Sequence, residues 1–153
     1  MKRTPMKPGK PLQRKTPMAP PRAAMRARRP GKRATKTIYR NRSLLDLARD
    51  QPCTLMIPGW CLGHSEPARE TTVACHSNWS KHGKGGHLKA HDWAIAFGCA
   101  GCHFYLDQSS APADDKVRYF ELGLTRTREA VMAMGKWPEE AERGYQLLYG
   151  SVE

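Results

Sequence analysis

The chain has 153 residues, enough for one modest domain, and a formal net charge of +12. Residues 1–43 hold 15 Lys and Arg and no Asp or Glu, whereas the remaining 110 residues hold 11 basic and 14 acidic side chains, so the excess charge lies in the N-terminal segment. The sequence shows neither the apolar core of a secretory signal nor an apolar run of the roughly 20 residues that span a membrane, so we expect a cytoplasmic protein with no membrane partner.

The first predicted element is a disordered basic arm over residues 1–42. Residues 1–36 contain seven of the 12 prolines and no run of large apolar side chains, so this segment cannot bury enough surface to offset the entropy lost on ordering its backbone. Basic segments of this composition bind along nucleic-acid phosphates and gain affinity by releasing counterions. DNA is therefore the expected partner, and a solubilising tail is the alternative. The arm residues expected to contact phosphates are Arg26, Arg28 and Arg29.

A short helix and a turn are predicted next. Ser43 followed three residues later by Asp46 resembles a capping box, and it predicts a short helix that ends before Pro52. Within residues 53–61, a Pro-Gly pair predicts a turn between two short β-prone arms.

Two extended segments are expected to flank a polar loop. Residues 71–76, TTVACH, predict a short strand that ends at His76, and residues 91–99 favour a buried extended segment that leads into a helix from Ala100. The loop over 77–90 is rich in Gly and Lys, contains no acidic residue, and is expected to face DNA; an ordinary surface loop is the alternative. Its candidate phosphate contacts are Lys81, Lys84 and Lys89.

The C-terminal third is predicted to be helical. A helix over 114–134 is indicated by apolar residues at helical spacing, and Gly135 is expected to end it. The apolar positions are Val117, Phe120, Leu124, Val131 and Met134. A last helix begins at Pro138, and residues 137–153 are expected to pack on the domain.

The motif Cys99-x-x-Cys102-His103 admits three interpretations: covalent haem attachment, half of a structural zinc site, or a zinc half-site whose histidine holds a second, catalytic metal. Haem is disfavoured, because covalent haem attachment normally follows export. Together with Cys53 and Cys61, the motif has the layout of a tetrahedral Cys₄ zinc site, and four buried reduced thiols are the alternative.

The remaining cysteine and three of the histidines have weaker cases for a metal role, and His87 has the strongest of these. The remaining cysteine, Cys75, is expected to be a buried strand thiol rather than a ligand or nucleophile. Three histidines are expected to be exposed on loops, namely His64, His82 and His87.

The order of these motifs resembles that of HNH (His-Me finger) endonucleases, and most closely the small HNH-type nucleases of lambdoid phages and prophages. The resemblance covers about residues 44–136, and it extends to an Ile-Pro-Gly turn between the first two cysteines, to Asp107 four residues after the C-x-x-C-H motif, and to a Gly-x-x-Arg-Thr sequence at Gly123. The motifs that carry it are Cys53-x₇-Cys61, Ala74-Cys75-His76, Lys89-Ala90-His91-Asp92 and Cys99-x₂-Cys102-His103.

The resemblance implies an α+β protein with a zinc-stapled ββα-metal core over residues 43–136 and flanking helices. It also implies metal-assisted hydrolysis of phosphodiester bonds in phage DNA recombination or processing, with a recombination protein as a further candidate partner. By this resemblance His76 is the general base, and His103 is a ligand of a catalytic cation, Mg²⁺ or Mn²⁺. Asp92 stands near the place of the pattern's Asn, which orients the base or assists the metal, and His91 is a candidate second ligand.

The sequence departs from the pattern at two places. Cys75 occupies the position directly before the base, where HNH sites carry an acidic or histidine ligand, and Asp92 lies seven residues before Cys99 instead of about five. The second ligand is therefore open among Asp92, His91 and His87, and His76 itself is a further candidate. The presence of Cys75 in place of an acidic ligand favours an alternative function, a non-catalytic zinc-ribbon protein that binds nucleic acid. The sequence does not indicate an oligomeric state.

Overall fold

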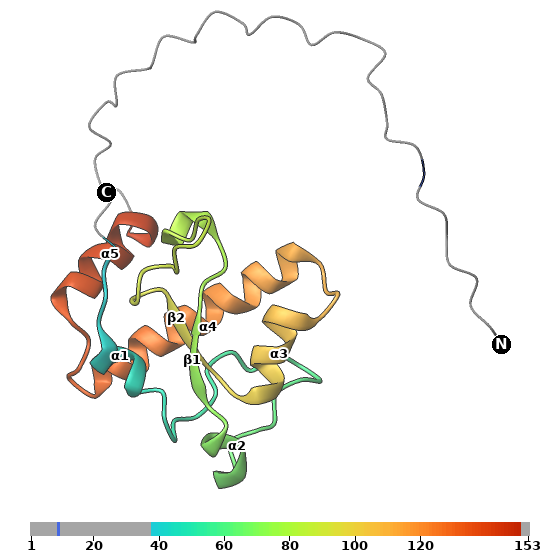
Figure 1. Cartoon of the computed structure of the whole chain (residues 1–153). Helices are drawn as coiled ribbons and strands as arrows, with labels where there is room; N and C mark the ends of the chain where they lie inside the picture. The colour runs from blue at the N-terminus through green and yellow to red at the C-terminus, as the bar shows by residue number, and fades with distance from the viewer. Residues whose placement is uncertain (1–8, 10–37, 151–153) are drawn as a thin grey trace, which may run out of the picture. The chain divides into compact units, whose positions relative to one another are not determined.

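The computed structural model describes residue 9 and residues 38–150. Within this part of the chain, a two-stranded antiparallel sheet lies against the long helix α4, and the shorter helices surround it (Figure 1). The predicted α+β class is confirmed. None of the helices in the described residues has the length and apolar character needed to cross a membrane. The elements are α1 (Arg42–Asp46), α2 (Glu66–Glu70), β1 (Val73–His76), the 3₁₀ helix η1 (Ser80–His82), β2 (Ile95–Gly98), α3 (Ala100–Gln108), α4 (Ala113–Ala133) and α5 (Glu139–Tyr149).

The sheet register places the end of β1 opposite the start of β2. His76 pairs with Ile95, and all four residues of β2 are buried. Because side chains alternate along a strand, Cys75 points to the face opposite His76. The Cys75 sulfur is buried in the core next to Gly98. A Cβ added at Gly98 would lie 2.5 Å from this sulfur. The expectation that Cys75 is a buried strand thiol is confirmed.

The core lies between β2 and α4. Phe120, Leu124 and Val131 are buried on the predicted apolar face of α4, whereas Met134 is 39% exposed beyond the end of the helix. At Gly123 the helix approaches the loop before the sheet so closely that a Cβ would lie 2.7 Å from Leu55 Cδ2. This contact holds the Cys53–Cys61 loop against the sheet and helix.

Residues 38–42, at the end of the predicted arm, are part of the folded domain. The N-cap of α1 is Asn41, whose side-chain oxygen accepts a hydrogen bond from the Leu44 N–H at 3.0 Å, so the predicted cap at Ser43 is wrong. The reason is tertiary: the Asn41 N–H donates to Asp92, 51 residues away, and this bond fixes where the helix can begin.

The loop over 53–61 forms no strands, contrary to expectation. The N–H groups of Thr54 and Leu55 both point to the Phe97 carbonyl, so the loop meets the sheet at one carbonyl instead of forming a ladder. The helix α2 follows this loop and is an element that we do not predict, although Ser65 at its N-cap and Glu66 and Pro67 in its first turn are signals of a helix start.

The expectation that His82 is exposed is wrong. Its ring is fully buried and contacts the rings of Trp93, Phe120 and Tyr149. The Ser77 hydroxyl lies 2.5 Å from Nδ1, and the Tyr149 hydroxyl lies 2.7 Å from Nε2. Burial lowers the pKa of His82 to about 4, so the imidazole is neutral at pH 7. His82 therefore joins the loop after β1 to α5.

A buried hydroxyl pair generates the first prediction. Thr54 and Thr127 lie with their hydroxyl oxygens 2.7 Å apart, and the Phe97 N–H donates to both. Replacing Thr127 by Val keeps the shape but leaves the Thr54 hydroxyl without this partner. We expect the free energy of unfolding to fall by about 1–3 kcal/mol. The matched control is Thr125→Val on the same helix, where the hydroxyl is half-buried. Equal decreases in the two variants, measured by urea unfolding, would contradict a stabilising role of the buried pair.

Candidate active site and metal centre

Four cysteine sulfurs come together where the loop before the sheet meets the start of α3. Their Sγ atoms all lie within 4.8 Å of one another, and the residues are Cys53, Cys61, Cys99 and Cys102. A tetrahedral zinc ion bound by four thiolates at about 2.3 Å brings its sulfurs to a similar separation. The cluster could hold a metal ion and is consistent with the predicted structural zinc.

Two backbone groups support this donor set. The Ile57 N–H donates to the Cys102 sulfur and the Leu62 N–H to the Cys99 sulfur, each at 3.4 Å, as expected of groups that stabilise thiolates. Gly101 lets the loop over 53–61 approach the start of α3 closely, because a Cβ at position 101 would lie 2.0 Å from the Trp60 carbonyl oxygen.

Two of these thiols, Cys53 and Cys102, shift the pKa of one another. A hydrogen bond with Cys102 lowers the pKa of the Cys53 thiol to about 4, and the same bond together with burial raises the pKa of Cys102. Four thiols at this distance cannot all ionise unless a cation balances their charge.

His76, at the end of β1, is oriented by a buried carboxylate. Its Nε2 lies 3.2 Å from Asp92 Oδ1, and because an ionised carboxylate only accepts hydrogen bonds, Nε2 carries the proton and Nδ1 is the acceptor. The His76 side chain is 24% exposed and that of Asp92 is 6% exposed. This is the arrangement in which a carboxylate fixes the tautomer and ring orientation of a basic imidazole.

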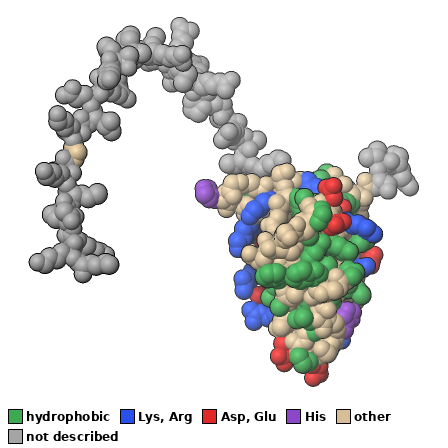
Figure 2. Space-filling model, turned by 90° about the vertical axis from the view of Figure 1, so that its right-hand side faces the viewer, with side chains coloured by type: hydrophobic (Ala, Val, Ile, Leu, Met, Phe, Trp, Pro, Cys, Tyr) green, Lys and Arg blue, Asp and Glu red, His purple; other side chains and the backbone are tan. Residues whose placement is uncertain are grey.

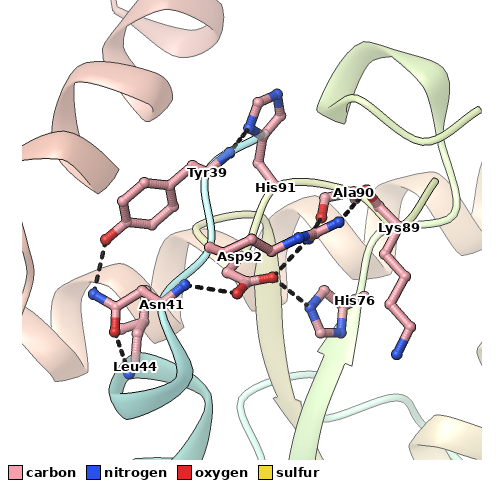
Figure 3. Close-up of polar contacts among 9 residues, drawn as sticks. Tyr39, Asn41, Leu44, His76, Lys89, Ala90, His91 and Asp92 are labelled. Atoms are coloured by element: carbon pink, nitrogen blue, oxygen red, sulfur yellow. Dashed lines mark hydrogen bonds and ion pairs between the residues drawn. The ribbon is translucent and has the colours of Figure 1, made fainter. Parts of the chain in front are cut away.

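Asp92 is held from a second side by residues that precede α1. Arg40 donates from Nη1 to Asp92 Oδ1 at 2.9 Å, and the Asn41 N–H donates to Oδ2 at 2.7 Å (Figure 3). Arg40 also donates to the backbone carbonyls of Lys89 and Ala90, so it ties the end of the loop to the carboxylate.

The charge state of Asp92 follows from these contacts. Burial raises the pKa of the Asp92 carboxyl, but the hydrogen bonds from the Asn41 N–H, His76 and Arg40 outweigh burial and hold that pKa below its ordinary value. The carboxylate is therefore ionised at neutral pH and fit to orient an imidazole.

His76 and His103 line the same open pocket of about 260 Å³. His103 lies on α3, is 43% exposed, and has its Nε2 3.1 Å from Asp107 Oδ2, one turn further along the helix. The other carboxylate oxygen of Asp107 accepts from the Asn78 side-chain N–H at 2.8 Å. The pocket thus combines two imidazoles, a carboxylate and an amide.

Lys84 and Lys89 are also lining residues of this pocket, whereas Lys81 is not. Lys81 pairs with Glu121 on α4. Two basic residues therefore line the same hollow as both histidines. The other predicted phosphate contacts, Arg26, Arg28 and Arg29, lie outside the described residues. Figure 2, which views the α3 side, shows Lys and Arg side chains mainly along one edge, beside a band of hydrophobic side chains.

His91 is not among the lining residues of the pocket. Its Nδ1 accepts a hydrogen bond from the Tyr39 N–H at 3.0 Å, and its ring lies against Gly83, where a Cβ would come within 2.6 Å of it. Figure 3 shows the His91 ring directed away from His76. The geometry brings Asp107, not His91, to the side of His103. His87 is exposed, as predicted, and does not line the pocket either.

Sequence patterns do not reveal two parts of this site. Arg40 falls within the predicted arm because it is one of 15 basic residues in a segment without acidic residues. Asn78 lies in the polar loop with no motif around it. Tyr39 directly before Arg40 is the available signal, since a large aromatic side chain is unusual in a solvated arm.

The sequence of residues 42–136 matches the model of a family described as "Putative nuclease YbcO". A solved structure described as that of "a putative bacteriophage protein from Escherichia coli str. K-12 substr. MG1655" is also similar. The two chains are 24% identical with a TM-score of 0.44, and the similarity covers 58% of this chain and 95% of that chain. No curated protein matches the sequence. Because the family match spans more than half of the 153 residues, the chain belongs to the family described as putative nuclease YbcO.

Proposed function

We propose that this protein is an HNH-type DNA endonuclease that hydrolyses phosphodiester bonds with His76 as general base and one divalent cation. The observation that carries the proposal is the shared pocket of His76 and His103, which also presents Lys84 and Lys89. Membership in a family described as a nuclease supports the reaction class. The roles of His76 and His103 are those that the resemblance to HNH endonucleases implies, and the geometry of the pocket is consistent with them.

His76 is suited to accept a proton from the attacking water. With Nε2–H donated to Asp92, the basic Nδ1 is available, and the ionised Asp92 carboxylate stabilises the imidazolium that forms. Arg40 and the Asn41 N–H keep this carboxylate in place, so they act on the base through Asp92. General bases of this kind contribute about 10²–10⁴-fold to the rate.

The residues that would hold the catalytic cation are His103 and Asp107, with the Asn78 amide beside them. The Nε2 of His103 and Oδ2 of Asp107 lie 3.1 Å apart, and a divalent cation bound there would replace the proton between them; water and a substrate phosphate would complete the shell of Mg²⁺ or Mn²⁺. Such a cation stabilises negative charge on the phosphate and on the leaving 3′ oxygen. We assign the second ligand to Asp107 in place of His91.

A substrate phosphate would be attracted to the pocket by Lys84 and Lys89, since both residues line the hollow and no acidic residue occurs between residues 71 and 91. The basic segment over residues 1–43 would raise the local concentration of DNA through contacts that carry no sequence information.

The alternative, a non-catalytic zinc-ribbon protein, is favoured in the sequence by Cys75 in the place of an acidic ligand. In the structure Cys75 points into the core, and Asp107 supplies a carboxylate beside His103. A binding module also has no need of a buried carboxylate that orients an imidazole. The endonuclease is therefore the function that the site supports best.

Zinc content tests the proposed Cys₄ zinc site. The purified protein is expected to contain about one zinc per chain, and Cys102→Ala is expected to lose it together with folding cooperativity. Cys75→Ala, a change of the same type at a buried thiol outside the cluster, should retain zinc. Elemental analysis that finds no zinc in the wild-type protein, or equal loss in the two variants, would contradict the Cys₄ site.

Plasmid nicking with Mg²⁺ or Mn²⁺, measured against a metal-free control, tests the reaction. His76→Ala is expected to lower the cleavage rate by about 10²–10⁴-fold with near-normal DNA binding, because the base is removed but the charged surface remains. His64→Ala, at an exposed histidine outside the pocket, is the control. Absence of nicking by the wild-type protein with every divalent cation tried would favour the binding alternative.

Deletion of residues 1–36 tests the arm. This removes 13 Lys and Arg, so we expect weaker DNA binding and a smaller dependence of log K on log salt, by about 0.9 for each phosphate that is no longer neutralised. Fluorescence anisotropy across a salt series measures both. An unchanged slope would show that the arm does not contact phosphates.

A further inference from the structure

A second hollow adjoins the proposed active site on its other side. It has about the same volume, 260 Å³, and lies between β1 and α1. The two hollows share three lining residues, Ala74, His76 and Lys89, so they meet at the proposed base. His76 therefore lies between two adjoining hollows on the outer side of β1, one bordered by α3 and the other by α1, and we refer to the pair as the groove.

The α1 end of this groove is basic. Arg42 and Arg49 line it together with Lys89, and the one acidic lining residue is Asp46. Both arginine side chains are well exposed, at 76% and 74%, so their guanidinium groups stand clear of the core and are accessible to a ligand. No sequence motif marks either residue as part of the site.

Asp46 contacts both arginines. Its Oδ2 lies 3.2 Å from Arg42 Nε, and its Oδ1 lies 3.7 Å from Arg49 Nη2. Exposed pairs of this kind contribute little to stability, so a ligand anion can replace the carboxylate as partner at little cost. Asp46 thus keeps two guanidinium groups near the groove when no ligand is bound.

We propose that Arg42 and Arg49 form a phosphate-binding subsite for the DNA strand that is cleaved, beyond the scissile phosphate at His76. This proposal rests on the proposed endonuclease function and specifies the path of the substrate. A sugar-phosphate backbone with one phosphate at His76 continues in both directions from that phosphate, and the groove offers a path on either side. Arginine suits the next phosphates because its fork of donors matches their oxygens. Lys89, which lines both hollows, bridges the two positions. In Figure 3 its side chain extends beside His76.

The path has a direction within the fold. The DNA strand would run from His103 on α3 and Lys84 in the loop after η1, past His76, and leave over α1. In sequence, α1 comes at the end of the basic N-terminal segment. Contacts by Arg42 and Arg49 would set the register of the strand relative to His76, because phosphate contacts position a protein on nucleic acid.

The test compares two double variants of the full-length protein that change the net charge equally. Arg42→Gln with Arg49→Gln alters the subsite; Arg118→Gln with Arg143→Gln alters two arginines that line neither hollow, one of which also pairs with acidic neighbours on its own helix. Binding of a labelled DNA duplex, and of a single strand of the same sequence, is measured by anisotropy across a salt series. Thermal unfolding verifies that all variants remain folded.

We expect the subsite variant to lower the slope of log K against log salt by about 1.8 on duplex DNA, which corresponds to two phosphates that are no longer neutralised, and the control variant to leave it near the wild-type value. Equal slopes for the two variants on both DNA forms would overturn the subsite. The difference between duplex and single strand identifies which form the groove takes.

A third variant is expected to strengthen DNA binding instead of weakening it. Asp46→Asn removes the carboxylate that competes with phosphate for both arginines, so DNA binding should tighten by more than it does in Glu139→Gln, where the removed carboxylate faces Arg143 instead. Equal effects of these two changes would contradict the competition.

Failure of the subsite can be distinguished from failure of the endonuclease. If the wild-type protein does not nick DNA with any cation but the slopes differ as expected, the phosphate subsite stands and the hydrolytic role of His76 is wrong. If nicking is observed but the two double variants have equal salt slopes, the reaction stands and the path over α1 is wrong.

Discussion

The approach of four sulfur atoms to within 4.8 Å is the constraint on which the rest of this structure depends. The loop over 53–61 has no strand pairing of its own, and the sheet has only two short strands in the described residues, so backbone hydrogen bonds alone do not fix their relative position. The cysteine cluster joins this loop to the junction between β2 and α3. A two-stranded hairpin is marginal in isolation, and a metal held by this cluster would supply the missing stability through the ligands it ties together. The orientation of α3, and with it His103, follows from that junction.

A second constraint converges on Asp92, a buried charged group. Its two oxygens receive hydrogen bonds from His76 at the end of β1, from the Arg40 side chain before α1, and from the backbone N–H of Asn41. An uncompensated buried carboxylate would be strongly destabilising, and each of these partners reduces that penalty. The same bonds make the imidazole of His76 well oriented. Stability and the proposed chemistry therefore depend on one carboxylate.

Local signals predict several parts of the fold. The helix α4 follows from apolar spacing, with Phe120, Leu124 and Val131 buried as expected, and Gly135, with φ +67°, ends it because glycine adopts this conformation without strain. The cysteine set follows from the C-x-x-C pair and its counterpart upstream. The predictions fail where a distant partner overrides a local preference. Asn41 replaces Ser43 as the cap of α1 because its backbone is bound to Asp92, and His82 is buried because α4 and α5 cover it.

Spacing along the chain was enough to identify the components: the long C-terminal helices, the cysteines that can form a metal centre, and the histidines that stand in a nuclease-like order. Spacing is a property of the sequence, so no structure is needed to read it. Which side chains lie next to one another became apparent only from the tertiary structure. Folding sets Asp107 beside His103 and directs His91 elsewhere, joins Arg40 to the domain, and aligns α1 with the groove at His76. These choices arise from side-chain directions and from contacts between residues far apart in sequence, which no local pattern encodes.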